Sequence, residues 1–550
     1  MDYIIKADRE QRTFLPDSLE AYVGEDNPVR VIDAFVDSLD MAELGFHRAA
    51  PGTTGRPPYD PRDLLKLYLY GYFNRIRSGR RLKKECTRNV EVMYLLCKLV
   101  PDYRTITDFR KDNSKAIKCV FQAFVKLCLK LNLYHKELIA IDGTKFRAVN
   151  SKDNAYNSET LHKKLVRIDA HIADYMQQLD AADKIEDKSD TEPLTSEQIH
   201  KVLEELKTRK DQYKDYVTYL NESGETQILT TDPEAHRMHT KDGFNCCYNA
   251  QTAVDAGSHL IAAYEVTNHN TDQGLLQVMG AQVKEALAVE TIEAVADKGY
   301  ESREDILNCL MDGTMPNVAL KYDKDERLYT LHYQEAEITE ETRTGTKPED
   351  IKKCLCAGVM PQCYENTSLH VELQEENVVG CFTRNDDGTV TCPMGQKLNK
   401  MKDKKPGMVY GSKEACRQCK NRCTSAKEAK TVYFGPDTKH VAVRMYSNSR
   451  HAVISPPREH TYHNAYYRKG LVRKKVLISI RQDKEKLLKR MCTVEHPFGT
   501  IKWYDGAHYL LCKGKEKVTA EIGLSYLAYN MKRAINMVGT RQLIEAIKES

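Results

Sequence analysis

The chain has 550 residues and a formal net charge of +4, from 83 Lys and Arg against 79 Asp and Glu. This length needs more than one hydrophobic core, and the charge is so nearly balanced that only local clusters of basic residues could serve nucleic-acid binding. The sequence shows no signal-peptide pattern and no apolar run near the ~20 residues that cross a bilayer, which predicts a cytoplasmic protein without a membrane partner. The 17 cysteines are therefore expected as reduced thiols or metal ligands rather than disulfides.

The first 135 residues predict a helical domain. Pro61 suits the first turn of a helix that Ser78–Gly79 ends, and a second helix is expected over 83–99. Arginines gather around these turns: Arg75, Arg77, Arg80, Arg81, Arg104 and Arg110. Short helices with basic turns are typical of helix-turn-helix-like DNA binders, for which Arg80 and Arg81 are candidates, and equally of a helical bundle with an ordinary charged surface.

Residues 151–225 predict an inserted helical hairpin. Apolar residues recur at three- and four-residue steps from Leu161 to Leu179, and again from Ile199 to Leu220. This pattern indicates a narrow apolar seam between two antiparallel helices. The hairpin could serve dimerisation or clamp DNA, or it could be a passive insertion.

The following segment predicts a mixed α/β sheet. Strands are expected over 244–254 and 258–266, joined by a turn at Asp255–Gly257. A helix over 275–289 then leads into a strand over 291–296. Strand, hairpin, helix and strand in this order are typical of a mixed sheet.

Three carboxylates stand out as candidate metal ligands. Asp142 and Asp297 each follow a short apolar run, and Glu495 lies in a basic segment that is expected to be helical. Two strand ends and a helix can deliver three carboxylates to a pair of divalent cations, an arrangement that cuts and joins phosphodiesters. Mg²⁺ prefers such oxygen ligands, although aspartates at strand ends are also ordinary turn residues.

Basic residues accompany these carboxylates. Lys145 and Lys298 follow the two aspartates closely, and each segment carries a glycine that lets the backbone approach a ligand. Lys502 lies two helical turns beyond Glu495, where it is expected on the same face and could pair with a phosphate oxygen. A basic run over 468–490 precedes this helix, and an apolar helix is expected over 522–538.

Residues 326–470 form a polar block that concentrates cysteines. The thiols of Cys392, Cys416, Cys419 and Cys423 could form a tetrahedral zinc site, which would organise an insertion with little apolar core. The alternative is that these cysteines are reduced and unligated. Cys246 and Cys247, by contrast, are expected to pack in a strand.

Other polar and aromatic residues have weaker interpretations. Asp255 and Asp272 are rivals for metal binding, but Asp255 suits a turn and Asp272 could cap the helix that follows it. His496 is expected as a helix-surface residue. Trp503, the sole tryptophan, could stack on an unpaired base, but it is expected rather to fill the core beside the active helix. Glu521 is expected to support helix packing.

Several sequence segments resemble bacterial insertion-sequence DDE transposases. The resemblance rests on IAIDGTKF around Asp142, AVADKGY around Asp297 and VEHPFGTIK around Glu495, with TDPEAHRM and GFNCCYNAQTAVD between them. It implies an RNase H-like mixed α/β core over 136–150, 226–325 and 471–550. An N-terminal helical DNA-binding domain (1–135) and two insertions, the helical hairpin (151–225) and the cysteine-rich block (326–470), would complete the chain.

The spacing of the motifs fits insertions of this kind. The separations are 297 − 142 = 155 and 495 − 297 = 198 residues, both longer than a bare core needs. A related family signature has tyrosine and arginine before the glutamate, but Leu488 and Met491 stand at those positions. Arg490 could substitute for the arginine.

The resemblance implies a transposase that cleaves the ends of its element and transfers 3′ ends to target DNA. Asp142, Asp297 and Glu495 would be its catalytic triad, with Mg²⁺ or Mn²⁺ as cofactor. Its partners would be terminal inverted repeats, target DNA and further copies of the chain in a dimer or higher assembly, associated with the nucleoid. The alternatives are a metal-dependent nuclease without strand transfer and a domesticated, non-catalytic DNA-binding regulator.

Overall fold

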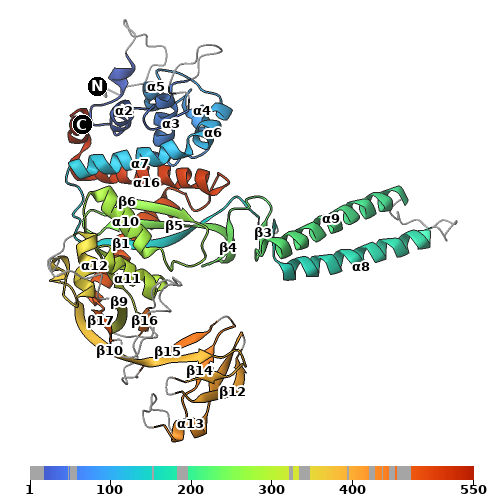
Figure 1. Ribbon diagram of the computed structural model, residues 1–550. Helices are drawn as coiled ribbons and strands as arrows, with labels where there is room; N and C mark the ends of the chain where they lie inside the picture. The colour runs from blue at the N-terminus through green and yellow to red at the C-terminus, as the bar shows by residue number, and fades with distance from the viewer. Residues whose placement is uncertain are drawn as a thin grey trace, which may run out of the picture. The chain divides into compact units, whose positions relative to one another are not determined.

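In the computed structural model, the chain is a mixed α/β protein (Figure 1). It describes residues 18–47, 49, 59–151, 154–182, 196–320, 326–333, 347–392, 395–404, 406–419, 428–436, 438–444, 452–454 and 472–549. The chain divides into two units, and two elements pass from one to the other. The first unit comprises 1–135, 142–272 and 493–550, and the second comprises 136–141 and 273–492.

The N-terminal part of the first unit is helical, as the sequence predicts. Its helices are α1 (Leu19–Tyr22), α2 (Val29–Asp37), α3 (Pro61–Phe73), α4 (Gly79–Glu85), α5 (Val90–Leu95), α6 (Tyr103–Asp112) and α7 (Ser114–Lys130). Pro61 occupies the first turn of α3, and the Asp60 side chain accepts the Arg62 amide, which caps the helix. The prediction of a single helix over 83–99 is wrong. The Asn89 side chain accepts the amides of Glu91 and Val92, so α5 begins there as a separate helix.

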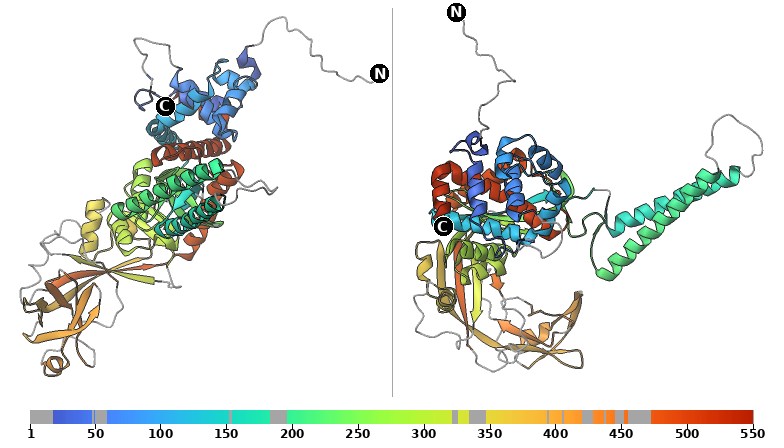
Figure 2. Two further views of the ribbon diagram at one scale, coloured as in Figure 1. Left: turned by 90° about the vertical axis from the view of Figure 1, so that its right-hand side faces the viewer. Right: turned by 90° about the horizontal axis from the view of Figure 1, so that it is seen from above.

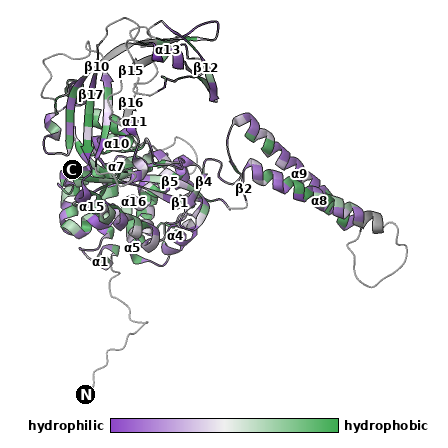
Figure 3. Cartoon of the chain, turned by 90° about the horizontal axis from the view of Figure 1, so that it is seen from below, coloured by the Kyte–Doolittle hydropathy of each residue, from purple (hydrophilic) through white to green (hydrophobic). Residues whose placement is uncertain are grey.

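The helical hairpin of the first unit consists of α8 (Ser158–Ala182) and α9 (Ser196–Ser223). Short strands β2 (Ala155–Tyr156) and β3 (Ile228–Leu229) pair antiparallel at its base. Both helices alternate between hydrophilic and hydrophobic residues along their length (Figure 3). Their buried seam contains Tyr156, Leu161, Ile168, Tyr213 and Leu220. The predicted antiparallel hairpin is therefore confirmed, and two further views show the helices side by side (Figure 2).

Three strands and two C-terminal helices form most of the rest of the first unit. Its elements are β4 (His236–Thr240), β5 (Gly243–Asp255), β6 (Ile261–Thr267), the π-helical turn η6 (Thr500–Tyr504), α16 (Lys515–Val538) and α17 (Thr540–Lys548). β5 pairs antiparallel with both β4 and β6. The predicted turn at Asp255 is confirmed, since its buried carboxylate accepts the Ser258 amide and hydroxyl.

Helices α7 and α16 lie side by side against β6 (Figure 1). The Asn530 side chain of α16 accepts the Ile261 amide, and Phe121 of α7 meets Tyr264 edge-on at 4.9 Å between ring centroids. Cys246 and Cys247 of β5 are buried, as expected. The predicted C-terminal helix over 522–538 is thus part of the core of this unit.

The second unit begins with parallel strands. Residues at the start of β1 (Ile139–Arg147) pair with β7 (Ile292–Ala296), which pairs with β8 (Thr314–Val318). Helices α10 (Leu276–Leu287) and α11 (Arg303–Met311) accompany them. The predicted helix over 275–289 and strand over 291–296 are confirmed. The capping role predicted for Asp272 is wrong, because Asp305 accepts the Leu276 and Gln277 amides at the start of α10.

The cysteine-rich block is largely β structure. Its elements are β9 (Glu326–Tyr333), α12 (Pro348–Cys356), β10 (Leu369–Arg384), β11 (Val390–Thr391), β12 (Lys397–Lys404), β13 (Gly407–Gly411), α13 (Lys413–Arg417), β14 (Val432–Phe434), β15 (His440–Arg444) and β16 (Ala452–Ile454). The next elements in the chain are β17 (Val472–Arg481) and α15 (Lys484–Gly499). β17 lies between β9 and β10. Within this block, Phe382, Tyr410 and Phe434 belong to a small buried cluster.

No helix in the described part of the chain combines the length and apolar character of a membrane span.

Candidate active site

Asp142 lies on β1, where it is half-buried. Its Oδ1 accepts the amide of Gly143 at 2.8 Å. The backbone of Gly143 lies directly against polar side chains from the neighbouring part of the unit. A Cβ on Gly143 would lie 2.5 Å from Gln251 Nε2, 2.6 Å from Asp272 Oδ1 and 2.9 Å from Asn249 Oδ1.

These three side chains form an amide–carboxylate cluster beside Asp142. Asn249 Nδ2 and Gln251 Nε2 both donate to Asp272 Oδ1, at 2.8 and 2.7 Å. Asn249 and Gln251 are buried on β5, whereas Asp272 is partly exposed. The buried Asn249 Oδ1 has no hydrogen-bond partner within the described residues. Asp272 was among the candidates from the sequence, but Asn249 and Gln251 were not, although their positions two residues apart on a strand place them on one face.

Lys502 joins the end of the Glu495 helix to the strand of Asp142. Its Nζ donates to Thr144 Oγ1 at 2.5 Å and to the Lys145 carbonyl at 2.7 Å. Burial lowers the pKa of Lys502 to about 8, and the nearby Asp142 carboxylate opposes that shift. Lys502 therefore lies in the same neighbourhood as Asp142.

The expected shared helix face of Glu495 and Lys502 stays a prediction, because the two residues do not lie on one continuous α-helix. α15 ends at Gly499, and the next turn is π-helical, with the Asp505 amide bonded to the Thr500 carbonyl at 2.8 Å. A π turn contains more residues than an α turn, so it changes the direction in which later side chains point.

Glu495 is exposed on α15. Its neighbour His496 forms a hydrogen bond with the Tyr529 hydroxyl at 2.8 Å, and Tyr529 donates to the His259 carbonyl. Burial, together with Arg533 and His259, lowers the pKa of His496 and favours its neutral form. His496 is exposed on α15, as expected of a helix-surface residue, and its hydrogen bond with Tyr529 also links this end of α15 to α16.

Asp297 belongs to the second unit, where it directly follows β7. Its side chain accepts the Gly299 amide at 2.7 Å and caps a short 3₁₀ turn over Lys298–Tyr300. Lys298 itself is exposed. The register of β1 with β7 places Ala140 opposite Val295.

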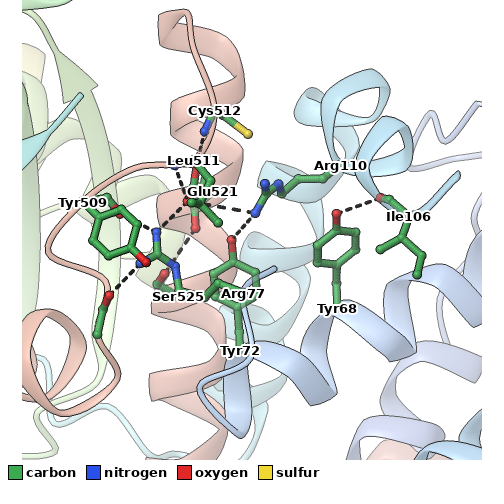
Figure 4. A network of polar contacts seen from close by, with 11 residues as sticks. Tyr68, Tyr72, Arg77, Ile106, Arg110, Tyr509, Leu511, Cys512, Glu521 and Ser525 are labelled. Atoms are coloured by element: carbon green, nitrogen blue, oxygen red, sulfur yellow. Dashed lines mark hydrogen bonds and ion pairs between the residues drawn. The ribbon is translucent and has the colours of Figure 1, made fainter. Parts of the chain in front are cut away.

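The predicted DNA-binding arginines divide into exposed and buried members. Arg80 and Arg81 are exposed on α4. Arg77 and Arg110 are buried instead, around the carboxylate of Glu521 on α16 (Figure 4). Their inclusion in a basic DNA-binding surface is therefore wrong.

Glu521 compensates the buried charges. It accepts Arg77 at 2.7 Å and the amides of Leu511 and Cys512, while Arg110 lies 4.0 Å away and donates to the Tyr72 hydroxyl. Burial alone would lower the pKa of Arg110, but the charges of Tyr72 and Glu521 raise it.

The described part of the basic run over 468–490 lies in β17 and the first turns of α15. Residues 472–481 form the strand β17, with Val476 and Ile478 fully buried. Lys486 pairs with Glu293 at 2.6 Å. Arg490 is half-buried on α15, and the start of the run lies outside the described residues.

The predicted zinc ligands are only partly described. Cys392, Cys416 and Cys419 are half-buried and form no disulfide with one another, and Cys423 lies outside the described residues. Cys392 packs against the small β cluster and accepts the Gln396 amide at 3.3 Å. Within the described ranges, no group of three or more His, Cys, Asp or Glu side chains is arranged to hold a metal ion. The zinc set and the Mg²⁺ triad therefore stay predictions.

Comparison with known proteins identifies one domain. Residues 17–112 match the family described as transposase domain (DUF772). This match supports a transposase in general. It covers the helices α1–α6 of the first unit.

The other comparisons add little. No curated protein matches the chain. Among solved structures, the chain is similar to one described as the piggyBac transposase synaptic complex with hairpin DNA, at 9% identity and a TM-score of 0.22, over 95% of this chain and 85% of that chain. A likeness this slight carries no argument about fold or mechanism.

Proposed function

We propose that the protein is a DNA transposase that binds the ends of its own mobile element, cleaves them and transfers the freed 3′ ends to target DNA. The observation that carries the proposal is the match of residues 17–112 to a transposase domain. An RNase H-like core is proposed for the α/β part of the chain. The setting of Asp142, between an amide–carboxylate cluster and a buried lysine, supports a reactive centre there.

Asp142, Asp297 and Glu495 are the proposed ligands of Mg²⁺ or Mn²⁺. Their oxygens are the donors that these cations prefer. Asp142 lies on β1, and Asp297 directly follows β7. Bound cations would polarise the phosphodiester and lower the pKa of the attacking water.

The chain's own residues would hold these ligands in place. The cluster of Asn249, Gln251 and Asp272 fixes the backbone beside Asp142. The bonds from Lys502 to Thr144 and Lys145 hold the segment that follows Glu495 against the same strand. Such positioning is a main protein contribution to in-line phosphoryl chemistry.

The proposed reaction has two displacements. Water attacks the phosphorus at the element end, the P–O3′ bond breaks, and the leaving oxygen takes a proton to become a free 3′-hydroxyl. That hydroxyl then attacks a phosphodiester of the target, where one P–O bond forms as another breaks. No covalent protein–DNA intermediate is needed.

DNA contacts are proposed for Arg80, Arg81, Lys298, Arg490 and Lys502. Phosphate contacts of this kind release counterions, so affinity should fall steeply as salt rises. Because two element ends are joined to one target, a dimer or higher assembly is proposed. Cytoplasmic, nucleoid-associated location and a structural zinc at the cysteine-rich block belong to the same proposal.

The test uses purified protein, Mg²⁺ and labelled DNA carrying the flanking ends of its own gene. The variants Asp142→Asn, Asp297→Asn and Glu495→Gln are expected to bind these ends but to lose both nicking and joining. Glu485→Gln is the matched control, because Glu485 is an exposed carboxylate on the same helix as Glu495.

Each outcome separates the candidates. Nicking without joining to a target plasmid would favour a nuclease. End binding without cleavage by the unmodified protein would favour a regulator. Cleavage that survives in all three variants would overturn the proposed triad.

A further inference from the structure

The segment after α15 exposes a group of aromatic rings. Trp503 is 75% exposed, Tyr504 62% and Tyr509 46%. Trp503 is the sole tryptophan of the chain. Leaving such large rings in water forgoes the stabilisation that their burial would provide, so an exposed group of them indicates a binding surface. The expectation that Trp503 fills the core is wrong.

The rings are already arranged for stacking. Trp503 stacks on His508, with 5.8 Å between ring centroids and 16° between ring planes. The Tyr509 ring meets the His508 ring edge-on, with 5.0 Å between ring centroids and 70° between ring planes. A flat, ordered pair of this kind presents a π surface at low entropic cost to a planar ligand.

Cationic side chains border these rings. The Arg75 guanidinium lies 3.3 Å from the centroid of the Tyr504 ring. The backbone amide of Arg147 donates to the His508 carbonyl, so the two residues are adjacent. The Arg147 side chain is about half exposed. Both arginines have acidic neighbours, Asp505 at 3.8 Å from Arg75 and Asp242 beside Arg147, so each charge is held in place rather than fully neutralised.

We propose that the Trp503–His508 pair stacks an unpaired base of a DNA strand, with Arg75 and Arg147 near its phosphates. Stacked rings bordered by arginines match a nucleotide, which combines a planar base with an anionic backbone. Bases within a duplex are covered by their neighbours, so this surface selects DNA whose base is already unstacked. The inference rests on the proposed function only in taking DNA as the substrate.

The test exploits the single tryptophan. With excitation at the red edge of the tryptophan absorption band, where tyrosine does not absorb, the emission of the full-length protein reports on Trp503 alone. The protein is titrated in EDTA with a single-stranded oligonucleotide, a fully paired duplex and the same duplex with an unpaired overhang. We expect quenching by the two DNAs with unpaired bases and little by the paired duplex. EDTA removes cleavage from the experiment, so the result does not depend on catalysis.

Variants then measure the contribution of stacking by fluorescence anisotropy of labelled DNA. Trp503→Ala should weaken binding of the overhang DNA by at least about fivefold, whereas Trp503→Phe should retain most of the affinity. Tyr433→Ala is the matched control, since Tyr433 is a partly exposed aromatic residue of the strand β14 in the second unit. Thermal unfolding of each variant checks that the fold is retained.

The inference is overturned if anisotropy shows DNA binding while Trp503 fluorescence stays constant, or if Trp503→Ala binds paired and unpaired DNA as the unmodified protein does. Absence of binding to any DNA, including the element ends, would instead overturn the proposed function as well.

Discussion

At the residue scale, Gly143 most directly constrains the candidate site. Its backbone lies against the buried amides of Asn249 and Gln251, which cannot swing into solvent. Glycine is needed here because of its neighbours and not because of its backbone angle, since its φ lies outside the left-handed region. A methyl group at this position would push directly on the segment that carries Asp142.

Gly143→Ala should therefore impair catalysis as well as stability. Overpacking of this kind costs about 1–3 kcal/mol, and we expect cleavage of the element ends to fall at least about tenfold, because the displaced backbone carries a proposed metal ligand. Single-turnover cleavage and thermal unfolding measure the two effects. Gly24→Ala is the control, since nothing lies within 4 Å of a Cβ there. Wild-type cleavage by Gly143→Ala would show that the cluster does not position Asp142.

Residues whose role follows from the neighbouring sequence could be predicted. Residues whose role depends on partners far away in the chain could not. Asp142 and Asp297 could be singled out because each follows a short apolar run in the sequence. Arg77 could not be recognised as buried, because its partner Glu521 lies 444 residues away in the chain. A charged residue identifies itself in the sequence, but the carboxylate that neutralises it does not.

At the element scale, strong periodicity made α3, the α8–α9 hairpin, β5–β6 and α16 predictable, whereas boundaries set by single side chains were not. Asn89 divides one expected helix into two by capping α5. The π turn after α15 redirects Lys502 toward β1, and nothing in a seven-residue spacing reveals that change. Side-chain capping and local helix type thus determine where a helix begins or ends and where its side chains point, which periodicity does not determine.

The Glu521 network couples helix α16 to the N-terminal helices, and its loss should be costly. Glu521 is 1% exposed and meets both Arg77 and Arg110. Removing one partner of a buried ion pair typically costs about 3–5 kcal/mol, because the remaining charges stay buried. Glu521→Ala should therefore lower the midpoint of the first unfolding transition in urea.

The control for this variant is Glu516→Ala, an exposed carboxylate in the first turn of the same helix. It should unfold close to the unmodified protein. If the two variants unfold at the same urea concentration, the network does not stabilise the first unit.

At the scale of the whole molecule, the first unit gathers segments from both ends of the chain, whereas the hairpin largely packs on itself. α7 and α3 pack against α16, so the N-terminal helices depend on the C-terminal one. The hairpin instead buries its seam between α8 and α9, and its ends meet at the paired strands β2 and β3. This difference predicts which part of the first unit can be removed.

Replacing residues 157–227 by Asn-Gly should leave the rest of the molecule folded. Tyr156 lies opposite Ile228 in an antiparallel pair, and a two-residue Asn-Gly turn closes such a hairpin without changing its register. We expect the midpoint of thermal unfolding of the remaining chain to shift by no more than about 4 °C, since few contacts outside the hairpin are lost. Differential scanning calorimetry measures this shift.

The same shortened protein decides what the hairpin does. If it loses self-association in sedimentation while still binding element ends, the hairpin serves dimerisation; if it stays associated but binds DNA more weakly and with a shallower salt dependence, the hairpin clamps DNA. Unchanged association and DNA affinity would identify a passive insertion. A variant that no longer unfolds cooperatively would contradict the premise, because it would show that the hairpin supports the core from which it extends.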